Sequence, residues 1–148
     1  MLNIIVLIKQ VPDIGNVIFD RNKGRIDRTS ASMEINPFDL NALETALQIK
    51  EECGGIITAL SMGPPSAEAT VRDAISRGAD RGILLSGTEY AGADTLATSY
   101  TLACAIKKSG SFDLIICGEK TVDGDTGQVG PEIAEHLNIT HVTYVSHI

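Results

Sequence analysis

The sequence predicts an α/β fold, in which an open parallel sheet of about five strands lies between two layers of helices in a Rossmann-like arrangement. Two observations predict it. Short apolar runs rich in isoleucine and valine alternate along the chain with segments of helical periodicity, and most of these runs lack a polar face, as strands covered by helices on both sides do. Right-handed crossovers between such strands build a three-layer sheet. A length of 148 residues fits one domain, which we expect to span residues 1–148.

The expected strands are five runs, of which the first is the most continuously apolar. They are residues 2–8, 56–60, 82–85, 113–117 and 141–145. The last run alternates apolar and polar side chains, so we expect it at an edge of the sheet. The first and fourth runs each precede a loop with ligand-binding character. Because ligands bind where the strand order of such a sheet reverses, we expect these two strands to be adjacent.

Capping residues and apolar periodicity predict four helices. The first begins at Asn36, a favourable N-cap residue, with Pro37 at the first helical position and the acidic Asp39 in the first turn. The second helix follows the turn at residues 63–65 and ends near Gly78, because glycine is the usual residue just past a helix end.

The third helix is expected to open at Asp94 and to end near Gly110, and the fourth to begin between Asp125 and Pro131. Residues spaced by three and four predict the buried face of each helix. The side chains expected to face the core are Leu40, Leu43, Leu47, Val71, Ala74, Ile75, Leu96, Tyr100, Ala103, Ile133, Ala134 and Leu137.

Residues 9–35 form a long connection before the first helix. Within it, residues 17–19 and 25–27 flank an Asn-Lys-Gly turn at 22–24, which predicts a small β-hairpin. A connection of this length in a compact domain is typical of a functional segment.

Composition excludes several classes of function. The net charge is −7, from 19 acidic and 12 basic residues, which argues against a nucleic-acid partner because such proteins carry basic patches. No stretch of 18 or so apolar residues is present, so we expect no membrane span. The three cysteines (Cys53, Cys104 and Cys117) are far apart in the sequence and predict reduced thiols in a cytoplasm rather than a disulfide framework or a metal site.

The loop after the fourth expected strand, residues 118–131, has the composition of an anion-binding turn. Three glycines spaced three apart let its backbone approach a ligand closely. The helix that follows supplies free amides and the positive end of its dipole. Thr126 and Gln128 add side-chain donors, and Lys120 is the cation at hand. These features predict a phosphate cradle made mostly of backbone.

Other interpretations of this loop stay open. Its G-x-x-G-x-x-G spacing matches neither the dinucleotide fingerprint nor the Walker A motif. Asp123 and Asp125 resemble the start of a calcium loop, but the position of the required glutamate is Ala134, so we expect no metal. A glycine-rich surface turn that binds nothing is the remaining alternative.

Further candidate residues lie near the ends of the other strands, each with a structural alternative. Lys9 could face a phosphate, although surface lysines are common. Asn36 and Asp39 could reach a ligand, although helix capping explains both. Met62 and Gly63 could line an adenine pocket, although a methionine there equally fills a core. The sequence has no hydrolytic triad, so we expect a nucleotide-binding domain without catalytic residues of its own.

Four segments resemble one known family in both order and separation. They are Val-Leu-Ile-Lys-Gln-Val-Pro-Asp at 6–13, Asn-Pro-Phe-Asp at 36–39, Met-Gly-Pro at 62–64 followed by Arg-Gly-Ala-Asp-Arg at 77–81, and the loop 118–131. The family is the beta subunit of electron transfer flavoprotein, also called FixA. The resemblance runs along the whole chain without a large gap.

The resemblance implies an adenine nucleotide alpha hydrolase-like fold, related to universal stress proteins and ATP pyrophosphatases. It implies an electron-carrier subunit that pairs with an FAD-bearing alpha subunit and itself holds AMP, or a second FAD in electron-bifurcating members. Residues 122–131 are similar to the bifurcating subgroup of anaerobes, which favours FAD. That subgroup oxidises NADH and splits the electrons between ferredoxin and an acyl-CoA dehydrogenase. The implied cofactor-binding residues are Leu7, Lys9, Asn36, Asp39, Met62, Gly63, Gly118, Thr121, Asp123, Gly124, Asp125, Thr126, Gly127, Gln128 and Val129.

Members of this family continue well past residue 148. The chain is therefore expected to be the N-terminal nucleotide-binding portion of a longer subunit, and to associate with itself or with an alpha subunit because apolar surface would be uncovered. The alternative is a stand-alone nucleotide-binding homodimer of the universal stress protein kind, whose late glycine-rich pattern is absent here. A structural interaction domain without ligand is the third possibility.

Overall fold

A computed structural model describes residues 1–13, 15, 18–20, 25–27 and 32–148. The strands are β1 (Leu2–Leu7), β2 (Gln10–Pro12), β3 (Ile18–Asp20), β4 (Arg25–Asp27), β5 (Met33–Ile35), β6 (Gly55–Met62), β7 (Arg81–Leu85) and β8 (Leu114–Cys117). The helices are α1 (Pro37–Cys53), α2 (Glu68–Ser76), α3 (Thr95–Ser109) and α4 (Val129–Leu137), with short 3₁₀ turns η3 (Pro65–Ala67) and η4 (Thr88–Tyr90). Among the described residues, no helix is both long and apolar enough to cross a bilayer.

The central sheet has four parallel strands in the order β7-β6-β1-β8. Leu7, the last residue of β1, pairs with Leu60 of β6 on one side and with Cys117 of β8 on the other. The α/β fold and the adjacency of the first and fourth expected strands are therefore confirmed. The strand order reverses between β1 and β8, which is where open α/β sheets bind their ligands.

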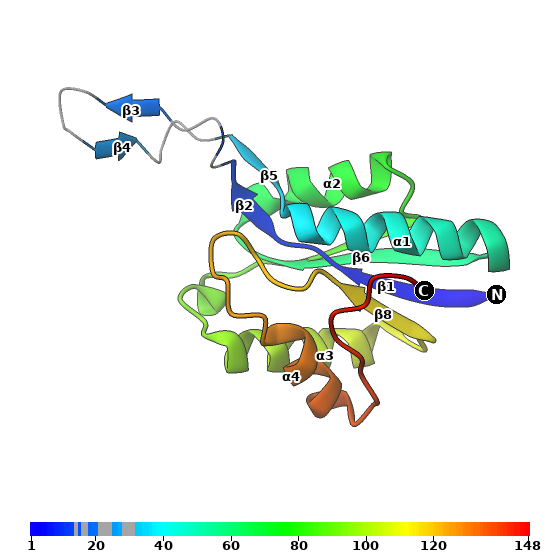
Figure 1. The fold of residues 1–148 in the computed structure, drawn as a ribbon. Coiled ribbons are helices and arrows are strands. Elements are labelled where there is room, and N and C mark those ends of the chain that lie inside the picture. Colours follow the sequence, from blue (N-terminus) through cyan, green and yellow to red (C-terminus); the bar gives the residue numbers. More distant parts are fainter. Residues whose placement is uncertain (14, 16–17, 21–24, 28–31) are drawn as a thin grey trace.

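Helices cover both faces of this sheet, α1 and α2 on one side and α3 and α4 on the other (Figure 1). Successive residues of β1 point into two different cores: Ile4 and Val6 pack toward α1 and α2, whereas Ile5 and Leu7 pack toward α3 and α4. Burial on both faces explains why the sequence of β1 is continuously apolar rather than alternating.

The expected strand at residues 141–145 does not form. Within the part of the chain that the structure describes, β8 has no further neighbour, and the residues after α4 are irregular. Val142 and Tyr144 are 78% and 82% exposed. An alternating pattern predicts a strand only where one face can be buried, and here neither side chain finds a core.

In two helices, some of the side chains that were expected to face the core are exposed. Leu96 and Tyr100 of α3 are 59% and 60% exposed, and Ile75 of α2 is 43% exposed. In α3 the expected burial of Ala103 is confirmed, and the other buried positions are Ser99, Leu102 and Ile106. Apolar residues lie on several sides of α3, so periodicity alone does not select the face that meets the sheet.

The long connection between β1 and α1 returns the chain to the end of β1. Strand β2 pairs with β5 antiparallel, and the amide of Asn36 donates to the carbonyl of Lys9 at 2.9 Å. The expected hairpin is present as the antiparallel pair β3 and β4, which Figure 1 shows away from the central sheet. Residue 17 and the turn at 22–24 lie outside the described residues.

Candidate functional site

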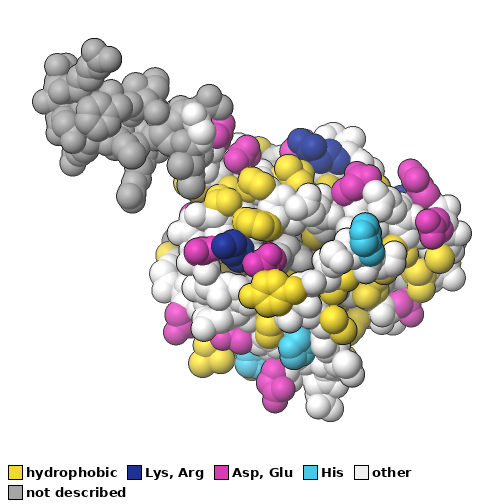
Figure 2. Space-filling model, in the orientation of Figure 1, with side chains coloured by type: hydrophobic (Ala, Val, Ile, Leu, Met, Phe, Trp, Pro, Cys, Tyr) yellow, Lys and Arg dark blue, Asp and Glu magenta, His cyan; other side chains and the backbone are white. Residues whose placement is uncertain are grey.

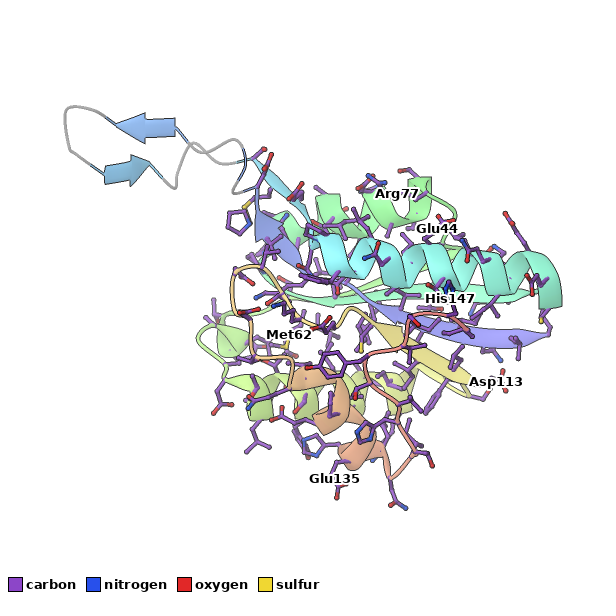
Figure 3. All side chains as sticks on the ribbon, viewed as in Figure 1. Glu44, Met62, Arg77, Asp113, Glu135 and His147 are labelled. Atoms are coloured by element: carbon purple, nitrogen blue, oxygen red, sulfur yellow. The ribbon has the colours of Figure 1, made fainter. Side chains whose placement is uncertain are left out.

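A cavity of about 410 Å³ lies at the carboxyl ends of β1, β6 and β8. It is at the point where the strand order reverses, between the start of α1 on one side and the loop that joins β8 to α4 on the other. Figure 3 labels Met62, the last residue of β6, at this end of the sheet and Asp113 at the opposite end. Leu7, Leu60, Met62 and Leu102 give the cavity an apolar part.

Most of the expected site residues meet here. Those that line the cavity are Leu7, Lys9, Asp39, Met62, Gly118, Thr121, Gly124, Thr126, Gly127, Gln128 and Val129. Gly63 does not line it, and its amide instead donates to the carbonyl of Leu85 at 3.0 Å. Asn36, Asp123 and Asp125 lie behind the lining, where each bonds to a part of the loop or to a lysine.

Asn36 fixes the loop from behind. Its side chain is fully buried, its Nδ2 donates to the carbonyl of Lys120 at 2.8 Å, and its Oδ1 accepts from the amide of Val122 at 3.1 Å. The expected start of α1 at Asn36 is confirmed, but its side chain makes no capping hydrogen bond. Helix capping is therefore the wrong explanation for the Asn36 side chain, which instead bonds to a loop more than eighty residues away in the sequence.

Asp39 joins the two strands that frame the cavity. It is only 5% exposed, and its carboxylate accepts from the amide of Lys9 at 2.8 Å and from the amide of Gly118 at 3.2 Å. These amides follow β1 and β8, so one side chain in the first turn of α1 ties both strand ends together. Burial raises the pKa of Asp39 to about 6, although its hydrogen bonds and the charge of Lys9 act in the opposite direction.

Two glycines permit close approaches around Asp39. A Cβ on Gly118 would lie 2.7 Å from the carbonyl carbon of Phe38, and one on Gly130 would lie 2.8 Å from Sγ of Cys117. Cys117 is exposed in part, but the protein atoms around its thiol remove enough water that desolvation, followed by the charge of Asp39, raises its pKa to about 11. A thiol with so high a pKa is a poor nucleophile at neutral pH.

The loop itself is held by two ion pairs. Nζ of Lys9 contacts both carboxylate oxygens of Asp123 at 2.8 Å, and Nζ of Lys120 lies 2.7 Å from Asp125 and 5.7 Å from the ring centre of Phe38. Burial alone would raise the pKa of Asp123, but hydrogen bonds from Lys9 and Thr121 and the charge of Lys9 outweigh it and lower that pKa. The hydrogen bond with Asp125 raises the pKa of Lys120.

The end of the loop presents backbone to the cavity. Gly127 has a φ of +63°, a conformation that favours glycine. Helix α4 begins at Val129, and Pro131 is its third residue. The first four amides of a helix have no partner within it, so the proline costs the helix no hydrogen bond there. The amides at this helix start are available to an anion.

Sequence reasoning missed the lining contributed by the start of α3. Asp94, Thr95 and Thr98 line the cavity, together with Tyr90 of the preceding turn η4. Asp94 caps α3 as expected, accepting from the amide of Ala97 at 2.8 Å. The available signal was topological: α3 follows the parallel strand β7, so its first turn must lie at the same edge of the sheet as the other strand ends.

Thr95 links α3 to the start of α4. Its hydroxyl shares one proton between Oε1 of Gln128 and Oε1 of Glu132, each at 3.2 Å. The same residue therefore lines the cavity and braces the loop end that presents free amides. Together with the apolar part, this arrangement suits a ligand with a flat apolar group and an anionic group.

Comparison with known proteins gives one consistent result. Residues 23–148 match the electron transfer flavoprotein domain family. The chain is 49% identical over 147 residues to an electron transfer flavoprotein subunit beta of Clostridium acetobutylicum, covering 99% of this chain and 56% of that protein. It is 48% identical over 145 residues to an acryloyl-CoA reductase electron transfer subunit gamma of Anaerotignum propionicum (97% and 54%). It is 49% identical over 148 residues to a protein FixA of Bradyrhizobium diazoefficiens (97% and 51%). The chain spans about half the length of these curated relatives.

Proposed function

This chain belongs to the electron transfer flavoprotein family, and on that premise we propose that its cavity holds an adenine nucleotide, FAD or AMP. The observation that carries the proposal is the make-up of the cavity at the point where the strand order reverses. One part of the cavity is apolar, and the other presents the free backbone amides at the start of α4. Ligands of α/β sheets bind at such reversals, and phosphates bind at helix starts.

The residues present fit such a ligand. A cavity of about 410 Å³ falls in the range of roughly 300–1,000 Å³ that is typical of small-molecule sites. Met62, Leu60 and Leu7 would contact the adenine, and Thr126, Gly127 and Val129 would donate to phosphate. Asn36 and Asp39 would position the two sides of the site without necessarily contacting the ligand. FAD would supply redox chemistry here, whereas AMP would supply none.

We place this site in an electron-carrier subunit. Residues 1–148 would form one nucleotide-binding domain that acts with an alpha subunit to shuttle electrons between NADH or acyl-CoA dehydrogenases and other acceptors. The names of the relatives support this role, including one electron transfer subunit of an acryloyl-CoA reductase. An electron-bifurcating member with FAD at this site is the form we favour. The three free cysteines of the described chain suit a reducing cytoplasm.

Nucleotide released from the purified protein tests the proposal. The protein is denatured, and the released compounds are identified by mass spectrometry and by flavin absorbance. FAD or AMP at close to one equivalent is the expected result. ATP would instead favour a homodimer of the universal stress protein kind, and a folded protein that neither carries nor binds a nucleotide would contradict the proposal.

The partner is tested separately. A purified alpha subunit of the same organism should co-elute with this protein in size-exclusion chromatography. Analytical ultracentrifugation that shows a clean monomer in the presence of the alpha subunit would contradict this part of the proposal and leave nucleotide binding standing.

A further inference from the structure

The cations that line the cavity are already paired with carboxylates. Among the described lining residues, Lys9 and Lys120 are the cations. Each is paired with an aspartate of the loop, Lys9 with Asp123 and Lys120 with Asp125. On the face shown in Figure 2, basic side chains likewise lie beside acidic ones. The cavity therefore offers a phosphate polar groups, but little net positive charge.

Other acidic side chains add to this balance. Asp39, Asp94 and Glu119 line the cavity itself. Two positive side chains thus stand against three negative ones that line the cavity and two more, Asp123 and Asp125, that lie behind the lining and pair with the lysines. The groups left to bind a phosphate are neutral donors, namely the hydroxyl of Thr126 and the backbone amides around Gly127 and the start of α4.

We propose that Asp123 and Asp125 set the specificity of this site by phosphate charge, so that it accepts AMP or the internal diphosphate of FAD and rejects nucleoside triphosphates. This inference rests on the proposed function, which it deepens by naming the class of nucleotide excluded.

The physical reason is electrostatic repulsion. A phosphate monoester such as AMP carries about two negative charges at pH 7, and the further phosphates of ATP add roughly two more. Neutral donors satisfy one or two phosphates, but the additional charge of a triphosphate meets unneutralised carboxylates. Like charges placed together without neutralisation discriminate strongly between ligands.

Displacing the aspartates does not remove this repulsion. An incoming phosphate could take the place of Asp125 beside Lys120, since the side chain of Asp125 is 68% exposed. The carboxylate would then lie nearby without its cation. The net charge of the site is the same in both arrangements, so the discrimination against a triphosphate persists.

Titration calorimetry tests this with AMP, FAD and ATP in the absence of divalent cations. The proteins are the parent, Asp123→Asn, Asp125→Asn and the double variant. The matched control is Glu135→Gln, which removes one negative charge from an exposed position on α4 (Figure 3). The parent should bind AMP at least about tenfold more tightly than ATP, and the double variant should reduce that ratio by about tenfold.

Asparagine keeps the size of aspartate, and Asp125 is exposed, so these variants should fold; circular dichroism checks this. The control should leave the ratio of AMP affinity to ATP affinity unchanged, and added salt should lower that ratio in the parent. Equal binding of ATP and AMP by the parent, or an unchanged ratio in the double variant, would overturn the specificity inference alone. A folded protein that binds none of the three nucleotides would overturn the proposed function and this inference together.

Discussion

The two walls of the cavity are built on different physical principles. The α1 wall is formed by Asp39, which lines the cavity, with Asn36 behind it; they are 5% and 0% exposed and bond to backbone groups that follow β1 and β8. Apart from the hydrogen bonds that Asn36 makes to its backbone, the loop wall, residues 119–128, is held by two lysine–aspartate pairs whose side chains are 30% to 68% exposed. One wall is buried and hydrogen-bonded, and the other is solvated and ionic.

The difference matters because the two kinds of contact differ in strength. A buried polar group left without its partner costs about 1–3 kcal/mol, whereas an exposed ion pair contributes only about 0–1 kcal/mol. We therefore expect the α1 wall to determine stability and the loop wall to determine what binds. The predictions below follow this contrast from the largest effect to the smallest.

Asp39→Ala should have the largest effect. It leaves the amides of Lys9 and Gly118 without their acceptor, so the free energy of unfolding should fall by about 2–5 kcal/mol. Urea denaturation measures it. The control is Asp73→Ala, which removes an exposed i,i+4 pair with Arg77 and should cost under about 1 kcal/mol. Equal losses in the two variants would remove the contrast between the walls.

Thr126→Ala should weaken binding without changing stability. A hydrogen bond to a charged oxygen is worth about 1.5–3 kcal/mol, so nucleotide affinity should fall by about ten- to a hundredfold. Gly127→Val should also weaken it, because φ is +63° there. Calorimetry with FAD and AMP measures both. Thr101→Ala, which removes a hydroxyl bonded to the carbonyl of Ala97 within α3, is the matched control. Parental affinity in folded Thr126→Ala and Gly127→Val would mean that the loop is only a turn.

Asp39 should also make stability depend on pH. Its folded pKa, raised to about 6 from 3.8, means that the folded state binds the proton more tightly than the unfolded state does. This contribution is fully present below the unfolded pKa and is lost as pH rises through about 6. Between pH 7.5 and pH 5, the parent should gain about 1 kcal/mol relative to Asp39→Asn in urea denaturation. An identical pH dependence in both proteins would show that the buried carboxyl does not titrate in this range.

Lys120→Gln should have the smallest effect. It removes an exposed ion pair with Asp125, so the free energy of unfolding should change by less than about 1 kcal/mol and the difference should shrink in high salt. A loss above about 2 kcal/mol would show that the loop wall carries stability as the α1 wall does.

The same contrast explains what the sequence could predict. Glycines predict the loop wall and apolar runs predict β1 and β8, because each of these features is determined by residues that are close together in the sequence. Asn36 and Asp39 looked like ordinary helix-start residues, since their real partners are 84 and 79 residues away at Lys120 and Gly118. Local patterns carry no record of such distant hydrogen bonds.

The lining from α3 was missed for a related reason. The sequence correctly placed the helix start at Asp94, but nothing within the helix indicates that its first turn meets the loop after β8. The error at residues 141–145 is the converse case. There a local alternating pattern was present, but residues 141–145 do not pair with the free edge of β8, and Val142 and Tyr144 stay exposed because neither side chain finds a core among the described residues.

The central position of β1 has a consequence for the order in which the protein is made. Its partner β6 ends at Met62, so a nascent chain can pair β1 on that side early. The pairing of Leu7 with Cys117 must wait for β8, which lies more than a hundred residues after β1 in the sequence. Contacts between residues so distant in sequence form slowly. The cavity needs that last pairing, so during synthesis part of the sheet can form before the binding site can.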